Sequence, residues 1–202
     1  MTLTKEVAPI SSFSSSRPCL SFVVSIFFLL FFNLFAISDA MRLVVQRVKS
    51  ASVTVEGKVV SQIGPGILAL VGLHEDDTES DLLYCCKRLL ACKLFENENA
   101  VAWRHGVKQK GFEVLCVSQF TLYGTLTKKH QPDYKRAMKS VNGAKEWYDK
   151  FLDMLKIEYE VDKIHDGVFG AMMDIALVND GPVTIVIESD VQQAAVADDN
   201  DD

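Results

Sequence analysis

The sequence has no excess of positive charge. Its 202 residues include 21 lysines and arginines against 27 aspartates and glutamates, a formal net charge of −6. Proteins that hold nucleic acid through a broad electrostatic surface are usually basic, so the composition argues against that class. Part of the acidity lies in an Ala/Asp-rich stretch, 190–202, which is typical of a disordered tail. Its acidic residues are Asp190, Asp198, Asp199, Asp201 and Asp202.

A local basic face is still compatible with this acidic total. One short polar stretch contains five cationic residues, namely Lys128, Lys129, Lys135, Arg136 and Lys139. Lysine and arginine are ordinarily exposed on protein surfaces. We therefore interpret most of these residues as a solvated helix and loop surface.

Paired cysteine motifs are also missing. The five cysteines lie at positions 19, 85, 86, 92 and 116, without the Cys-x-x-Cys spacing of a zinc site or the framework of a disulfide-rich domain. The four histidines are scattered, and the sequence has no glycine-rich phosphate loop. We expect buried free thiols in a reducing compartment, and no metal or other cofactor.

What the chain does have is strong hydrophobic periodicity from residue 42 onward, which predicts one domain. Helical spacing predicts helices over 78–92, with Thr78 as the N-cap, and over 142–159. A shorter helix is expected over 133–139. Turn residues at 179–182 predict a hairpin. Strands are predicted at 42–48, 52–56, 58–63, 67–72, 112–123, 168–178 and 183–188.

This pattern of elements predicts the fold class. We expect a mixed α/β domain built on a largely antiparallel, strongly curved, barrel-like sheet with two or three helices.

A polar segment, Ser118-Gln119-Phe120-Thr121-Leu122, closes one of the apolar runs. Side chains of an extended strand alternate between its faces, so Gln119 and Thr121 would face one site together. A threonine hydroxyl needs a base before it can act as a nucleophile. The nearest downstream candidates, His130 and Asp133, fall in an expected loop. An ordinary strand end with a satisfied hydroxyl is the alternative interpretation.

Several segments, in this order and spacing, resemble the D-aminoacyl-tRNA deacylases, the D-Tyr-tRNA(Tyr) deacylase family. The resemblance covers residues 41–189 and implies an enzyme that hydrolyses the ester between a D-amino acid and the 3′ end of tRNA. Glycine mischarged on tRNA is a further substrate implied by it. The segments that carry it are Ser118–Leu122, Asn179-Asp180-Gly181-Pro182-Val183-Thr184, Met41–Val48, Ala51–Val55 and Phe169–Met173.

The resemblance also implies a role in chiral proofreading during translation. The partners would be aminoacyl-tRNA and a second copy of the chain in a homodimer, and the location would be the cytoplasm.

The first motif is expected to carry the chemistry. We assign Thr121 and Gln119 to positioning the substrate and the main-chain N–H of Phe120 to the oxyanion, with Ser118 in the same catalytic motif. Water or the substrate's own 2′-hydroxyl is expected to supply activation, because the hydroxyl next to an aminoacyl ester already assists its carbonyl. The resemblance agrees with this assignment, since the family relies on the RNA more than on a protein nucleophile.

The second motif is expected to read chirality. The resemblance implies that Gly181 and Pro182 form a cis peptide bond and enter the active site of the partner subunit, with Val183 and Thr184 beside the substrate. There the main chain would collide with the side chain of an L-amino acid, while D-amino acids and glycine fit. A side-chain pocket that senses one methyl group would change substrate affinity by only about 1–3 kcal/mol. Rigid main chain instead rejects the L-amino acid by collision. Taken alone, the segment would be a simple hairpin turn.

A third segment, Phe169-Gly170-Ala171-Met172-Met173, is similar to the family's segment near the pocket for the 3′-terminal adenosine. Phe169 is expected to contact the adenine, with Gly170, Ala171 and Met173 beside it. A strand with a glycine at a bend is the alternative interpretation.

Residues 1–40 differ from the rest of the chain. An uncharged, phenylalanine-rich run from Leu20 to Ile37 fits either a signal-peptide core or a short membrane anchor. Because the resemblance begins at a methionine, Met41, an alternative start is a third explanation. The expected layout is an N-terminal extension over 1–40, a deacylase domain over 41–189 and an acidic tail over 190–202.

Other hypotheses stay open beside the deacylase. Membrane contact is expected only if 20–37 is retained as an anchor, and targeting to a membrane or organelle is not decided. One alternative function is a catalytically silent RNA-binding module on the same fold, which the intact motifs disfavour. Another is a membrane-tethered interaction protein, which rests on 20–37 alone.

Overall fold

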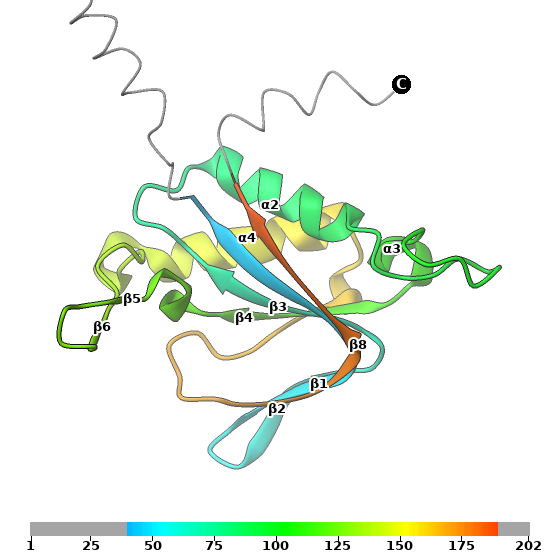
Figure 1. Ribbon diagram of the computed structural model, residues 1–202, viewed down its shortest axis with the longest axis horizontal. Coiled ribbons are helices and arrows are strands. Elements are labelled where there is room, and N and C mark those ends of the chain that lie inside the picture. The colour runs from blue at the N-terminus through cyan, green and yellow to red at the C-terminus, as the bar shows by residue number, and fades with distance from the viewer. Residues whose placement is uncertain (1–39, 190–202) are drawn as a thin grey trace, which may run out of the picture. The chain divides into compact units, whose positions relative to one another are not determined.

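The computed structural model describes residues 40–189. At their centre lies a six-stranded sheet with the strand order β2-β1-β3-β4-β7, and β8 pairs with β1 (Figure 1). β1 is antiparallel to β2, β3 and β8, whereas β3, β4 and β7 are parallel. The predicted mixed α/β fold with a strongly curved, barrel-like sheet is confirmed. The strands are β1 (Arg42–Val55), β2 (Lys58–Ile63), β3 (Gly66–Gly72), β4 (Glu113–Ser118), β7 (Ile164–Asp166) and β8 (Asp174–Glu188).

β1 is one strand of 14 residues, so the prediction of separate strands at 42–48 and 52–56 is wrong. Its first half pairs with β3 and its second half with β2, while β8 runs beside both halves. The chain stays extended through Lys49 and Ser50 because β8 continues alongside them. The register with β8 shifts around Val48 and Ser50, and such irregularities bend a strand without ending it.

β8 is also a single strand, of 15 residues, and the hairpin predicted at 179–182 is wrong. Residues 174–179 and 183–188 both pair antiparallel with β1, so the chain keeps its direction through the motif. Residues 180–182 have no partner in the ladder and form a bulge. The turn residues are accommodated as a bulge because the same neighbouring strand pairs with both flanks.

β3, β4 and β7 run parallel, so their carboxyl ends meet at one edge of the sheet. Their last residues are Gly72, Ser118 and Asp166. In open α/β sheets, ligands usually bind beyond the carboxyl ends of such strands. This edge is therefore the first place to look for a site.

Helices α2 (Glu79–Ala91) and α4 (Ala144–Glu158) pack against each other and cover one face of the sheet (Figure 1). Both were predicted. Thr78 is the N-cap of α2, and its N–H donates to Asp81 Oδ2 at 2.7 Å. Tyr148 and Phe151 of α4 are fully buried, in a core cluster that also holds residues of α2 and the sheet. A second, smaller core packs around Leu115 and other apolar residues of the strands.

Two predicted elements end or fold differently. The strand predicted at 112–123 stops at Ser118, and Phe120–Tyr123 form a short 3-10 helix, η2. The helix predicted at 133–139 is replaced by β6 (Pro132–Asp133), which pairs with β5 (Thr125–Leu126). The Asp133 side chain accepts the N–H of Lys135 at 3.1 Å, which turns the chain instead of starting a helix.

The strand predicted at 168–178 begins only at Asp174, and the residues before it form a loop in which Gly170 has a φ of 76°. Besides η2, β5 and β6, four short elements were not predicted: α3 (Val107–Lys110), η3 (Ser140–Asn142), η4 (Val161–Lys163) and β7. The predictions for 1–40 and 190–202 concern residues outside the described range, apart from Ala40.

Candidate active site

The Ser118–Leu122 motif turns sharply at the carboxyl edge of the sheet. Ser118 is the last residue of β4 and pairs with Val71 of β3. The next N–H, of Gln119, donates to the Val71 carbonyl at 2.7 Å, and the 3-10 helix η2 starts immediately afterwards. The alternation of a strand therefore ends at Ser118. The prediction that strand alternation places Gln119 and Thr121 on one face is therefore wrong.

The two side chains nevertheless meet. Gln119 Nε2 donates to Thr121 Oγ1 at 2.5 Å. The N–H of Phe120 stands at the first position of η2, where a helix offers no internal acceptor. One turn thus brings together an amide side chain, a hydroxyl and an N–H available to a ligand.

Contacts with Ala40, β1 and β3 hold η2 in place. Arg42 Nη1 donates to the Leu122 carbonyl at 2.9 Å. Tyr123 is buried, and its hydroxyl donates to the Ala40 carbonyl at 2.6 Å. A Cβ on Gly72 would lie 3.1 Å from Tyr123 and 3.2 Å from Leu122, so η2 packs directly against the glycine that ends β3.

Phe120 is unusual for an aromatic residue because 55% of its surface is exposed. Its ring makes an edge contact with Tyr134, with the centroids 5.0 Å apart. Tyr134 follows β6, so the contact ties η2 to the β5–β6 hairpin.

Neither suggested base bonds to Thr121 in the structure. His130 stands in the exposed turn of the β5–β6 hairpin with a φ of 59°. Asp133 lies 3.0 Å from Lys135 Nζ, and the hydrogen bonds from Lys135 lower the pKa of this carboxyl group. The protein supplies Thr121 with no acid–base partner among residues 40–189.

The Phe169 segment reaches the same edge of the sheet. The N–H of Gly167 donates to the Cys116 carbonyl at 3.2 Å, so the chain after β7 continues beside the end of β4. Phe169 is half-buried, and its ring centroid lies 5.5 Å from that of Tyr148. The Tyr148 hydroxyl donates to Asp166 Oδ1 at 2.6 Å. Burial raises the pKa of Asp166 above its ordinary value.

The other residues of this segment form a tight loop. Ala171 N–H donates to the Val168 carbonyl at 3.1 Å, and Met173 Sδ accepts the N–H of Val168 at 3.3 Å. Gly170 is exposed. Phe169 packs against the core cluster that includes α2 and α4, whereas Met173 packs against the smaller core of the strands.

The Asn179–Thr184 motif lies on the bulge of β8. The Gly181-Pro182 peptide bond is cis, and Gly181 has a φ of 119°. A Cβ on Gly181 would lie 2.9 Å from Val183 Cγ2. Gly181, Pro182 and Thr184 are exposed, whereas Val183 is half-buried.

The strand register separates the two motifs within one chain. Val183 pairs with Arg47, which is level with Ile67 and Val114, whereas Ser118 is level with Val71. The bulge is therefore about 13 Å from the first motif along the strands and three strand spacings away across the sheet. In Figure 1, β5 and β6 lie at the left and the bend of β8 at the right. The structure does not bring the two motifs together in a single subunit.

The basic residues lie on the β5–β6 hairpin and just after it, next to η2. Lys128 and Lys129 are exposed in its turn, and 85% of the Lys135 side chain is accessible. Arg136 is half-buried and Lys139 exposed. Although the protein is acidic overall, positive charge adjoins the candidate site.

Sequence reasoning missed Arg47, which contacts the bulge. Its Nε lies 3.0 Å from Asp180 Oδ2 and donates to the Asp180 carbonyl at 3.3 Å. The available signal was a charged residue between apolar residues of a predicted strand.

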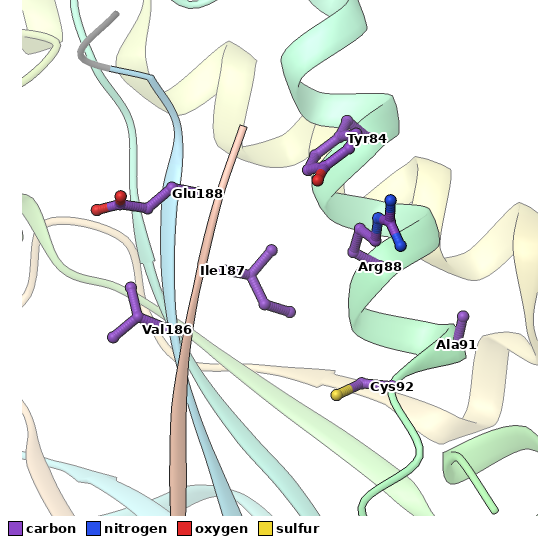
Figure 2. A pocket seen from close by; sticks show the side chains of 7 residues that line it. All are labelled: Tyr84, Arg88, Ala91, Cys92, Val186, Ile187 and Glu188. Carbon is purple, nitrogen blue, oxygen red and sulfur yellow. The ribbon is translucent and has the colours of Figure 1, made fainter. Parts of the chain in front are cut away.

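A pocket of about 390 Å³ between α2 and β8 was also not predicted. Figure 2 shows the α2 side chains on one wall and β8 on the other. None of the motif residues lines it. The lining residues are Tyr84, Arg88, Ala91, Cys92, Val186, Ile187 and Glu188.

The described cysteines are free thiols, and three of the four are buried as expected. Cys85, Cys86 and Cys116 are buried and Cys92 is half-buried, all without a disulfide. Burial raises the pKa of the Cys86 thiol to about 11, so it is protonated near neutral pH.

Within residues 40–189, no three potential ligands form a metal-binding group. No helix in that range is long and apolar enough to cross a membrane.

A polar turn at the carboxyl edge of a curved α/β sheet, without a nucleophile–base pair, fits a hydrolase that acts on a substrate carrying its own reactive group. The family model for D-Tyr-tRNA(Tyr) deacylase matches residues 44–188. The chain belongs to this family.

Relatives of known family agree with this assignment. The chain is 50% identical to the D-aminoacyl-tRNA deacylase of Drosophila melanogaster over 153 residues, which covers 76% of this chain and 95% of the relative. It is 41% identical to the enzyme of the same name in Saccharomyces cerevisiae, covering 74% and 99%. It is 43% identical to D-aminoacyl-tRNA deacylase 1 of Homo sapiens, covering 78% and 75%. Membership makes the chain a deacylase, a carboxylic ester hydrolase.

A solved structure described as c-Myc DNA unwinding element binding protein is similar with a TM-score of 0.70 and 43% identity, covering 74% of this chain and 99% of that one. A probable eukaryotic D-amino acid tRNA deacylase has a TM-score of 0.64 at 18% identity, covering 74% and 100%. The second likeness supports the fold alone.

Proposed function

We propose that the chain hydrolyses the ester bond of D-aminoacyl-tRNA, and of glycine mischarged on tRNA, and spares L-aminoacyl-tRNA. The supporting observation is the turn at the end of β4, where Gln119, Thr121 and the Phe120 N–H converge beside the Phe169 loop. Free tRNA and a D-amino acid are the products. The activity serves chiral proofreading in translation, which favours the cytoplasm.

The proposed reaction needs no protein nucleophile. The oxygen of a water molecule attacks the ester carbonyl, and the substrate's 2′-hydroxyl assists by hydrogen bonding. The carbonyl oxygen becomes negatively charged and is stabilised by the Phe120 N–H, an interaction of the kind that contributes about 10²–10³-fold to the rate. The bond from the carbonyl carbon to the ribose 3′ oxygen then breaks, and that oxygen takes the proton lost by water. Gln119 and Thr121 hold the ester in line, and Ser118 fixes the point where the strand ends.

The Phe169 loop is proposed to hold the terminal adenosine. It lies at the same sheet edge as η2, and its half-buried aromatic ring offers a face for a base. Gly170, Ala171 and Met173 line the approach, and Gly170 has no side chain to obstruct it.

Gly181-Pro182 is proposed to work in the partner's site of a homodimer, with Val183 and Thr184 flanking the substrate. Two observations support this placement. The bulge is exposed and too far from its own η2 to act there. The strand that carries it also exposes apolar side chains, with Val178 54% and Val186 57% accessible, as expected of a surface that a second subunit covers.

The basic β5–β6 hairpin is proposed to contact the phosphates of tRNA next to the ester. Lys128 and Lys129 are exposed in the turn of this hairpin, which contacts η2 through the rings of Tyr134 and Phe120. Phosphate contacts position a nucleic acid without reading its sequence.

The proposal is tested with purified protein and tRNA charged with D- or L-tyrosine. We expect rapid release of D-tyrosine, slow release of L-tyrosine, and no effect of chelators. Equal rates for the two enantiomers would refute the proposed function.

A further inference from the structure

A buried carboxylate without a cation lies where β1 begins. Asp77, between β3 and α2, is only 7% exposed. Its Oδ2 accepts the N–H of His74 at 2.8 Å, but its Oδ1 has no partner among the described residues. The other charges that act on it are carboxylates, Asp76 and Asp81, and burial raises its pKa to about 7. A buried carboxylate is costly unless a cation pairs with it.

The main chain of Met41 points its nitrogen at this group. The main-chain N–H of Met41 faces the Asp77 carboxylate and lowers its pKa, opposing the larger effect of burial. The carbonyl of Met41 accepts the N–H of Ser189 at 2.9 Å, and the Cys85 thiol lies 3.8 Å from the same oxygen. The Met41 side chain is fully buried in the core. Residue 41 is therefore fixed on every side, with its nitrogen at the unpaired carboxylate.

We propose that Asp77 is a binding site for an α-ammonium group, and that its ligand is the amino group of Met41 in a form of the protein whose chain begins there. An ammonium group has three N–H donors where a peptide nitrogen has one. It would give Asp77 Oδ1 a donor and supply the missing positive charge.

A chain that begins at Met41 would lose the hydrogen bond between Tyr123 and Ala40, but Tyr123 has a second acceptor nearby. The Tyr123 hydroxyl now donates to the Ala40 carbonyl, and the Gly72 carbonyl lies 3.4 Å from the same hydroxyl. Tyr123 thus keeps an acceptor when Ala40 is absent. His74 Nε2 and Ser189 Oγ are also buried without partners among the described residues, and buried water molecules commonly bind such polar groups.

The test compares chains that differ only at their start. Residues 41–202 are suited to it because the matched region makes up 95% of the Drosophila relative and 99% of the yeast one, so this region folds on its own. One form begins with the free amino group of Met41. A second carries Gly-Ser before Met41, and a third is the full chain. Asp77→Asn is introduced into each, with the exposed neighbour Asp76→Asn as the matched control.

The direct readout is the pKa of the Met41 amino group, from the pH dependence of its labelling by an acylating reagent and mass spectrometry. We expect it to lie at least about one unit above the ordinary 7.7–8.0, with labelling at neutral pH at least about tenfold slower than for the Gly-Ser form. Asp77→Asn should restore ordinary labelling, and Asp76→Asn should not. An amino group that titrates in the ordinary range and labels as fast as the Gly-Ser form would overturn the proposal.

Thermal unfolding gives a second readout, which compares the free-amine and Gly-Ser forms with Asp77 intact as well as with Asp77→Asn. The free-amine form should unfold at a higher temperature than the Gly-Ser form near pH 7, and Asp77→Asn should abolish the difference. Equal midpoints with Asp77 intact would overturn the proposal even if the Asn variant failed to fold. Neither readout depends on deacylase activity.

Identifying the natural amino terminus tests whether a chain that begins at Met41 exists and how it is produced. Mass spectrometry of protein from its own cells should find a chain that starts at Met41, produced by initiation at that codon or by cleavage after Ala40. Met41→Leu, which conserves core volume, prevents the first route and leaves the second. Chains that all begin upstream of Met41 would refute the proposed ligand.

Discussion

Arg47 binds Asp180 twice, through the carboxylate at 3.0 Å and through the main-chain carbonyl at 3.3 Å, both from Nε. Its Nη1 donates to the Leu94 carbonyl at 2.5 Å, and its guanidinium lies over the ring of Trp103 at 5.7 Å from the centroid. The arginine side chain is largely buried, with 18% accessible. A residue of β1 thus fixes the position of the residue that precedes Gly181-Pro182.

The first prediction concerns Arg47→Lys. A lysine keeps the charge but has no planar fork to bond several groups at once, so the bulge should lose its fixed position. We expect kcat/KM for D-Tyr-tRNA to fall by about tenfold or more, with circular dichroism unchanged. Arg88→Lys, on the surface of α2, is the matched control. Unchanged D-tyrosine release by Arg47→Lys would show that the bulge needs no such support.

The second prediction concerns Gly181→Ala. The new Cβ would meet Val183 at 2.9 Å, where the main chain is proposed to approach the substrate. We expect a loss of activity of about 100-fold or more with the fold retained. Gly57→Ala is the matched control, because Gly57 also has a positive φ but open space around it. If both variants lose activity equally, backbone strain rather than the motif is responsible.

Mixing experiments locate the second motif. An inactive Gly181 variant and an inactive Gln119 variant should together regain part of the activity, because some heterodimers would assemble one site from two wild-type halves. Failure to recover, once subunit exchange has been verified, would place both motifs in the site of one subunit.

The third prediction separates positioning from attack at Thr121. If Thr121 only positions the ester, Thr121→Ala should keep measurable activity and Thr121→Ser should offer no special rescue. A tRNA ending in 2′-deoxyadenosine should be a much poorer substrate for the wild-type protein. A trapped covalent aminoacyl–Thr121 adduct would contradict this role.

The sequence was sufficient wherever local periodicity decides the structure. The helices α2 and α4 follow from apolar residues at helical spacing, and the aromatic residues of α4 are core as that spacing indicates. The hairpin prediction failed because Asn179-Asp180-Gly181-Pro182 has turn chemistry, while the direction of the chain is set by pairing of both flanks with β1. That pairing is long-range and leaves no local signal.

The same distinction between local and long-range determinants applies to the candidate site. Its polar residues were identified from the motif, but the turn that joins Gln119 to Thr121 depends on contacts of η2 with Gly72 and Arg42, far away in the sequence. The distance between the two motifs within one subunit follows from the strand register. A sequence pattern does not give that register.

The fourth prediction concerns the pH dependence of the full chain. The pKa of Asp77 is raised from 3.8 to about 7 in the folded protein, so the folded state binds more protons than the unfolded state between these values. Stability from this group is fully present below about pH 4 and is lost as the pH rises to about 7, a change of about 4 kcal/mol. Asp77→Asn should flatten this part of the pH profile in urea unfolding. An unchanged profile would show that another group is responsible.

The fifth prediction concerns the basic hairpin and separates RNA contact from catalysis. Reversing both charges, Lys128→Glu with Lys129→Glu, should lower kcat/KM for D-Tyr-tRNA by about tenfold at low salt. It should also flatten the dependence of log kcat/KM on log salt by about one unit for each phosphate contact removed. Hydrolysis of D-tyrosine esterified to a trinucleotide should be unaffected, because that substrate ends before the proposed contact.

The matched control reverses two exposed lysines far from η2, Lys58 in the β1–β2 hairpin and Lys87 on α2. It changes the total charge equally, so a general electrostatic effect would lower both variants alike. A loss confined to the hairpin variant and to full-length tRNA means that β5–β6 touches the RNA beyond its terminal nucleotides. If the trinucleotide ester is also cleaved more slowly, the substitutions disturb η2 through the Phe120–Tyr134 contact, and the hairpin is part of the active-site support instead.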